Sequence, residues 1–111
     1  MTPKQFRAFL DRDKACYHCG STGDDLVPQH RKNRKMGGNR SLKSDPNNII
    51  VFCAEANGRL ESDANFARIG VEFGWKLNSW ENLSNPVYEA HTGLWWYLNG
   101  NERIALPAIP D

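Results

Sequence analysis

The spacing of the three cysteines constrains the fold of this chain more than any other feature. Cys16 and Cys19 are two residues apart, and Cys53 follows after a long interval. A two-residue gap lets a tight turn direct both thiols toward one metal ion, and a closed zinc site uses four ligands. A second such pair would end at position 56, where the chain has Ala56. Two interpretations stay open: a zinc site completed by His18 or water, or three thiols without metal.

The length of 111 residues predicts a single domain over residues 1–111 with a small core, which a metal ion or oligomerisation would help to stabilise. An odd number of cysteines does not indicate a secreted disulfide framework, so we expect a reducing, cytoplasmic setting. No apolar run approaches the length of a membrane span, and the N-terminus lacks the apolar core of a signal peptide. We therefore expect no contact with membranes.

Basic residues gather in one segment although the net charge is only +1. Residues 30–43 contain no acidic side chain. The candidates for contacts with nucleic-acid phosphates there are Arg31, Arg34, Lys35, Arg40 and Lys43. The segment is either such a phosphate-binding strip or a solvated loop.

Local patterns predict an α+β fold. The expected elements are a helix over 2–13, strands over 26–30 and 48–53 separated by a long loop, a helix over 62–74, and a β-meander over about 84–107. Thr2 and Gln5 form a capping box at the first helix, and Ser62 is the expected N-cap of the second. Gly93 and Gly100 are expected in the turns of the meander.

The aromatic residues of the C-terminal half allow two interpretations. In one, Trp75, Trp80 and Trp95 fill the small core while Trp96 covers an edge. In the other, Trp96 and Tyr97 belong to an exposed patch that binds a protein partner or stacks on bases, because consecutive strand residues point to opposite faces.

Four polar residues have a spacing that suits a metal nuclease. His30 ends the first predicted strand, Asn48 precedes the second, and Asn57 and Glu61 are four residues apart, on one helical face. A strand, loop, strand and helix would bring the imidazole against that face. A histidine could then act as general base for water while helix-borne ligands hold a divalent ion on the scissile phosphate.

The segment "QHRKNRKMGG…SDPNNIIVFCAEANGRLESD", framed by the Cys16–Cys19 pair, resembles the HNH endonucleases of the ββα-metal fold, most closely their small phage-encoded members. The resemblance covers about residues 16–73. It implies a ββα-metal core with a degenerate zinc knuckle, between an N-terminal helix and the C-terminal meander. The implied roles are His30 as general base, Asn48 as the middle asparagine, Gln29, Asn57 and Glu61 as metal ligands, and Cys16, Cys19 and Cys53 as the remaining knuckle cysteines.

The departures from the family pattern change the expected chemistry. Gln29 offers an amide oxygen where the family has a charged or imidazole ligand. An all-oxygen set of Gln29, Asn57 and Glu61 suits Mg²⁺ or Mn²⁺ rather than Zn²⁺. Glu61 is either a ligand or an acidic residue favoured near a helix N-terminus, with Asp63 as its substitute. Both interpretations of the cysteines, with and without Zn²⁺, stay open.

Three functions follow from these patterns. The first is a metal-dependent endonuclease that hydrolyses DNA phosphodiester bonds in the bacterial host of a phage. The second is a catalytically inactive HNH-fold protein that binds a host or phage protein through its aromatic C-terminal region. The third is a DNA-binding module without hydrolytic activity.

Overall fold

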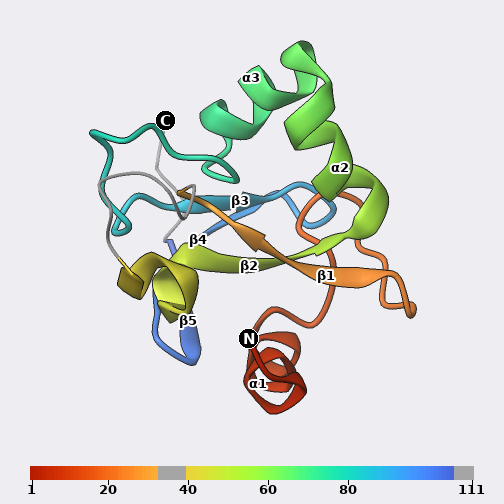
Figure 1. Ribbon diagram of the computed structural model, residues 1–111, viewed down its shortest axis with the longest axis vertical. Coiled ribbons are helices and arrows are strands. Elements are labelled where there is room, and N and C mark those ends of the chain that lie inside the picture. The colour runs from red at the N-terminus through yellow and green to blue at the C-terminus, as the bar shows by residue number, and fades with distance from the viewer. Residues whose placement is uncertain (33–39, 107–111) are drawn as a thin grey trace.

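The computed structural model describes residues 1–32 and 40–106, without the side chains of residues 40 and 41, and confirms the predicted α+β class (Figure 1). The elements are α1 (Pro3–Asp13), β1 (Leu26–His30), the 3₁₀ turns η2 (Arg40–Lys43) and η3 (Pro46–Asn48), β2 (Ile49–Cys53), α2 (Ala54–Ser62), α3 (Ala64–Glu72), β3 (Val87–Glu89), β4 (Leu94–Asn99) and β5 (Glu102–Ala105). Among the described residues, no helix has the length and apolar character needed to span a membrane.

Helix α1 begins with the predicted capping box. The Thr2 hydroxyl accepts a hydrogen bond from the Gln5 backbone N–H at 3.1 Å, and the Gln5 side chain accepts one from the Thr2 backbone N–H at 2.8 Å. Pro3 occupies the first turn, where its missing N–H costs nothing. These bonds satisfy two backbone donors that a helix start otherwise leaves to solvent.

Replacing Thr2 with alanine is expected to destabilise the domain by about 1 kcal/mol, because an alanine N-cap has no acceptor for the Gln5 N–H. Thermal unfolding followed by circular dichroism measures this loss. The control is Ser84→Ala, which removes a hydroxyl from an exposed loop position. Equal midpoints for the two variants would contradict the stabilising role of the cap.

Strand β2 lies at the centre of the molecule and is buried on both faces. It pairs antiparallel with β1, with Leu26 opposite Cys53 and His30 opposite Ile49. Side chains alternate along a strand, so Ile49 and Val51 face one side and Ile50 and Phe52 the other. The first side packs on Phe9 of α1, and the second joins the larger core. Figure 1 shows α1 on one side of this hairpin and α2 and α3 on the other.

Helices α2 and α3 meet at Asp63, which ends one and begins the other. Its carboxylate accepts hydrogen bonds from the backbone N–H groups of Asn65 and Phe66 in the first turn of α3. The prediction of Ser62 as this N-cap was wrong by one residue, because Ser62 is the last residue of α2 and bonds back to the Gly58 carbonyl. Asn57 and Glu61 therefore lie on α2, directly after β2.

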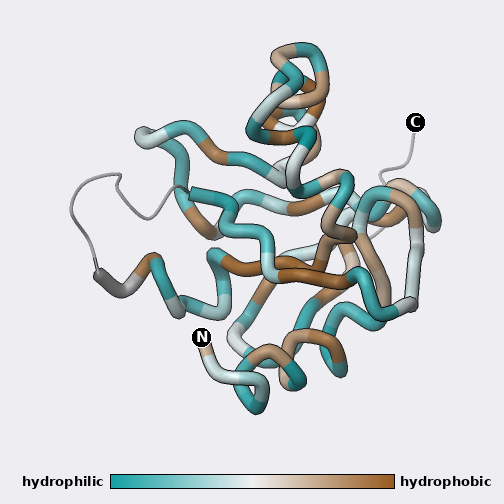
Figure 2. Tube along the Cα trace, turned by 45° about the vertical axis from the view of Figure 1, so that its right-hand side comes forward, coloured by the Kyte–Doolittle hydropathy of each residue, from teal (hydrophilic) through white to brown (hydrophobic). Residues whose placement is uncertain are grey.

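The C-terminal meander forms a second antiparallel sheet in the order β3-β4-β5. Gly93 and Gly100 lie in its turns with φ of 76° and 65°, a region in which other residues are strained. Figure 2 shows hydrophobic residues concentrated along the central strands of the molecule.

The predicted aromatic core is correct at Trp75 and wrong at Trp80. Trp75 is 1% exposed and donates its indole N–H to the Tyr88 carbonyl, which ties the segment after α3 to β3. Trp80 is 81% exposed in the loop between α3 and β3. Trp95 and Trp96 are half-buried on the second sheet.

Candidate functional site

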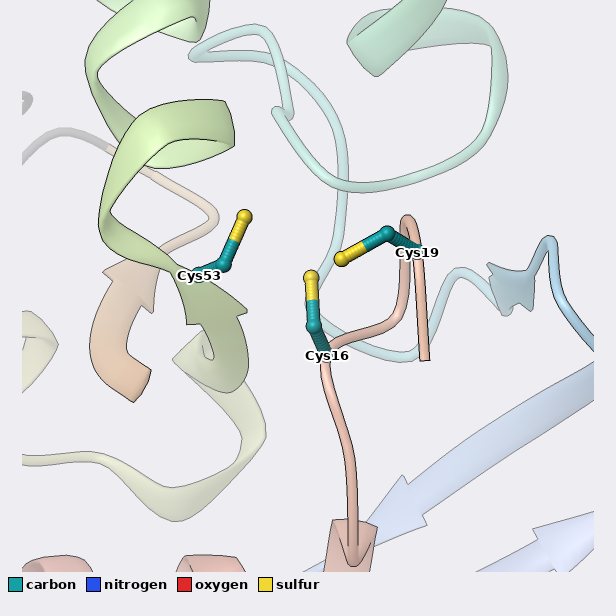
Figure 3. A group of neighbouring side chains, drawn as sticks. All are labelled: Cys16, Cys19 and Cys53. Atoms are coloured by element: carbon teal, nitrogen blue, oxygen red, sulfur yellow. The ribbon is translucent and has the colours of Figure 1, made fainter. Parts of the chain in front are cut away.

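The fold brings all three cysteines together. Cys16 and Cys19 come from the turn after α1, and Cys53 comes from the junction of β2 and α2. Their sulfur atoms all lie within 4.8 Å of one another (Figure 3). The backbone N–H of His18 donates to the Cys16 sulfur and that of Ala56 to the Cys53 sulfur, each at 3.4 Å. Such N–H donors stabilise thiolates, the form that binds metal.

A metal ion at this cluster would have to displace the proton of a buried thiol. Cys16 and Cys53 are buried, whereas Cys19 is exposed. Burial raises the pKa of Cys16 to about 12, so on its own this thiol is protonated at neutral pH. A metal ion supplies the positive charge that deprotonates a coordinating thiol. The three cysteines could therefore hold a metal ion such as zinc.

His18, which the sequence left open as a fourth ligand beside water, is not part of the cysteine group. Its ring packs edge-on against Phe66 at 5.1 Å and Trp75 at 5.6 Å between ring centroids. Its Nδ1 atom is buried without a hydrogen-bond partner, and burial lowers the pKa of the ring, which favours the neutral imidazole. The side chain thus serves the aromatic core rather than the cysteines.

His30 has one ring nitrogen fixed by the backbone. At the end of β1, its Nε2 atom lies 3.0 Å from the carbonyl oxygen of Lys43 in η2. A carbonyl only accepts hydrogen bonds, so Nε2 is the protonated nitrogen. In the neutral imidazole, Nδ1 then keeps its lone pair and is the basic atom.

Asn48 makes the backbone hydrogen bonds predicted for it. The side chain is fully buried. Its oxygen accepts from the Lys32 N–H at 2.7 Å, and its amide nitrogen donates to the carbonyls of Lys32 and Leu42 at 3.1 and 2.8 Å. The amide thus ties the end of β1 to η2 on the two sides of the long loop, which holds the segment that carries His30.

The predicted divalent-metal ligands are only partly brought together. Gln29 is 3% exposed and donates its amide nitrogen to the carbonyls of His30 and Trp75, so its Oε1 atom points toward α2. There it accepts a hydrogen bond from the amide nitrogen of Asn57. Glu61 is exposed one turn further along α2. Within residues 1–32 and 40–106, no hydrogen bond joins His30 to Asn57 or Glu61.

The prediction that Arg31 contacts nucleic acid is wrong. Its side chain is 1% exposed, and its guanidinium donates to five backbone carbonyls within the fold, so none of it is available to a phosphate. Lys43 is exposed beside His30. Arg34 and Lys35 lie outside the described residues, as does the side chain of Arg40.

Sequence reasoning missed a buried carboxylate in the second sheet. Glu89 is 2% exposed and accepts hydrogen bonds from Thr92, Trp96 and Arg103. The bond to Arg103 is part of an ion pair of 2.9 Å, and these contacts hold the pKa of Glu89 below its usual range despite its burial. Glu89 ends a three-residue strand and precedes turn residues, a position typical of a solvent-exposed glutamate. The sequence alone therefore does not indicate this network.

No protein-family model matches the chain, and neither a curated protein nor a solved structure does. The described residues define two features of chemical interest. One is the three-cysteine group, and the other is a histidine with a fixed ring nitrogen at the end of β1.

Proposed function

We propose that this chain is a small endonuclease of the HNH type that hydrolyses phosphodiester bonds of DNA, with His30 as its general base. The observation that carries the proposal is the hydrogen bond between His30 Nε2 and the Lys43 carbonyl. This bond leaves Nδ1 as the basic nitrogen of a half-buried ring. A positioned imidazole is the most common general base in enzymes.

In this proposal His30 removes a proton from water as the water oxygen attacks phosphorus. The new P–O bond replaces the bond to the leaving sugar oxygen, which takes a proton from solvent, and the proton of the attacking water passes to Nδ1. The same Lys43 whose backbone carbonyl holds His30 has an exposed side chain. Its ammonium would attract the phosphate backbone without reading sequence.

The proposal assigns Mg²⁺ or Mn²⁺ to the oxygen atoms of Gln29, Asn57 and Glu61, and the fit of these residues is partial. The Gln29 oxygen is held toward α2 by the two carbonyls that accept from its nitrogen. Asn57 presents its nitrogen to that oxygen, so its amide must turn over before both oxygens face one cation. When bound, the ion would neutralise charge on the phosphate.

Zinc at Cys16, Cys19 and Cys53 has a structural role in this proposal. The first two belong to the turn after α1, and the third to the junction of β2 and α2. An ion shared by them would fix this turn against the start of α2, the helix that carries Asn57. A small domain gains more from such a cross-link than a large one.

The amide pair of Gln29 and Asn57 favours a second candidate, an HNH-like DNA-binding domain without hydrolysis. The pair is uncharged, and each amide already has a protein partner. Neutral ligands attract a divalent cation weakly, because Mg²⁺ gives up its water reluctantly. Salt-sensitive DNA binding without strand cleavage would identify this candidate.

Purified protein is expected to nick supercoiled plasmid in the presence of Mn²⁺ or Mg²⁺, and His30→Ala is expected to slow nicking by roughly 10²–10⁴-fold, the usual contribution of a general base. Agarose gels that resolve supercoiled from open-circular DNA measure the rate.

The matched control is His91→Ala, which removes an exposed imidazole at the opposite end of the chain, on the turn between β3 and β4. It should nick within about twofold of the parent, since its contacts are with Glu89 and Gly20, which have no role in the proposed hydrolysis. Absence of nicking by the parent, or equal rates for the parent and His30→Ala, would refute the nuclease. Circular dichroism establishes that both variants are folded.

A further inference from the structure

We propose that the metal site formed by Cys16, Cys19 and Cys53 keeps its fourth coordination position open and binds a small thiol there as a thiolate. A structural zinc ion takes four protein ligands, and a site with three retains a position for water or an exogenous ligand. This inference concerns the cysteine group alone and does not depend on the proposed nuclease activity.

The fourth position is open because the described part of the chain supplies no further donor. Among residues 1–32 and 40–106, the cysteine sulfurs are the only Cys, His, Asp or Glu ligand atoms that gather in this group. Ala56 follows Cys53 by three residues, as Cys19 follows Cys16, and its side chain is a methyl group. Ala56 is 2% exposed, and its backbone N–H already donates to the Cys53 sulfur.

The two nearest imidazoles are engaged elsewhere. His18 packs its ring into the aromatic core against Phe66 and Trp75. His91 lies against the turn beside Cys19, where a Cβ atom on Gly20 would come within 2.9 Å of its ring. Its Nε2 atom, however, lies 3.3 Å from the Glu89 carboxylate. Neither ring therefore completes the site.

Solvent reaches the group from one side. Cys16 and Cys53 are buried, and Cys19 is exposed. Figure 3 shows the three sulfur atoms directed into one space between the turn and the start of α2. A small ligand would approach the group past Cys19, the exposed cysteine of the three.

The sulfur-rich set selects the chemical class of that ligand. Three thiolates exceed the charge of one divalent zinc ion, so the ion polarises bound water weakly and is a poor hydrolytic centre. Soft sulfur donors bind such a site in preference to oxygen. In such a site, the thiolate of an incoming thiol would replace one bound water, and the thiol proton would pass to solvent.

Cobalt substitution tests the open position, because the visible ligand-field absorption of Co²⁺ changes when a ligand is exchanged. Titration of the Co²⁺ protein with 2-mercaptoethanol is expected to shift these bands saturably, with one thiol per site. Ala56→Cys supplies a fourth thiolate, and its spectrum should not respond to the thiol. This variant should also bind Co²⁺ at least roughly tenfold more tightly, about 1.4 kcal/mol.

Ser62→Cys is the matched control, since it adds a thiol at an exposed position at the far end of α2. It should respond to 2-mercaptoethanol as the parent does. A parent spectrum that the thiol leaves unchanged, or one that changes on His18→Ala or His91→Ala before thiol is added, would overturn the open site. Failure to bind Co²⁺ would overturn it as well. The thiol titration of the parent decides the question even if Ala56→Cys does not fold.

Discussion

Arg31→Met is expected to destabilise the domain by about 3–5 kcal/mol, because the change leaves five backbone carbonyls without their shared donor. The guanidinium donates to the carbonyls of Gly74 at 2.8 Å, Asn47 at 3.2 Å, Leu83 at 3.1 Å, Asn85 at 2.7 Å and Pro86 at 3.4 Å. Methionine fills part of the volume and donates nothing. A domain of this size has a total stability of roughly 5–15 kcal/mol, so a large part of it would be lost.

The buried arginine remains charged under these conditions. Burial lowers the pKa of Arg31 to about 10, which is still well above neutral pH. Arg31→Lys is expected to rescue little, since a single ammonium cannot span acceptors that a planar guanidinium reaches in several directions.

Urea denaturation measures the loss of stability, and a thermal midpoint lower by about 15–25 °C should accompany it. Arg68→Met is the control, because Arg68 is an exposed arginine whose guanidinium donates to Asn65 on the same helix. It should change stability by less than about 0.5 kcal/mol. If the two variants were equally stable, the carbonyl contacts of Arg31 would contribute nothing to the fold.

The burial of Arg31 is also a feature that the sequence alone could not predict. In the run His30 to Lys35 it resembles Arg34, and nothing local distinguishes a buried arginine from a solvated one. The difference arises from carbonyls 16 to 55 positions away, which the tertiary fold brings to the guanidinium. Trp80 was misjudged for the same reason, because hydrophobicity alone does not determine which loop aromatic is covered.

Features determined within a few residues were predictable. The capping box of Thr2 and Gln5 and the glycines in the turns of the meander depend on local backbone geometry, and each is present. The spacing of Cys16 and Cys19 likewise predicted a turn that directs two thiols to one point. Cys53 joins these two thiols only if the predicted hairpin and the helix after it form. The residue patterns of both elements were clear enough to predict them.

The predicted divalent-metal site could be predicted from the sequence only in part. The sequence spacing correctly predicted that Asn57 and Glu61 share one helical face and that Gln29 lies beside that helix. Spacing could not reveal that Gln29 and Asn57 would bond to each other. That outcome depends on the Trp75 carbonyl, which orients the Gln29 amide and comes from a segment 46 residues away. Side-chain orientation at a site is thus set by its surroundings, which no local pattern encodes.

Removal of zinc from the three-cysteine group is expected to lower the thermal midpoint by roughly 20 °C. Free zinc at about 1,000 times its dissociation constant stabilises a folded protein by about 4 kcal/mol. Each kcal/mol corresponds to roughly 5 °C for a domain of this size. The effect is expected because a bound ion would join the turn after α1 to the β2–α2 junction, two segments that the unfolded chain does not hold together.

Thermal unfolding of the zinc-loaded protein with and without excess EDTA measures this change, and Cys53→Ser provides the control. Cys53 is the N-cap of α2, where its sulfur accepts from the Ala56 N–H. Serine is a favoured N-cap, so the variant keeps the helix start and loses only a metal ligand. Its midpoint should match that of the EDTA-treated parent and should not fall further with EDTA. If EDTA left the parent unchanged, the cysteines would contribute through packing alone, and the cluster would have no role as a metal site.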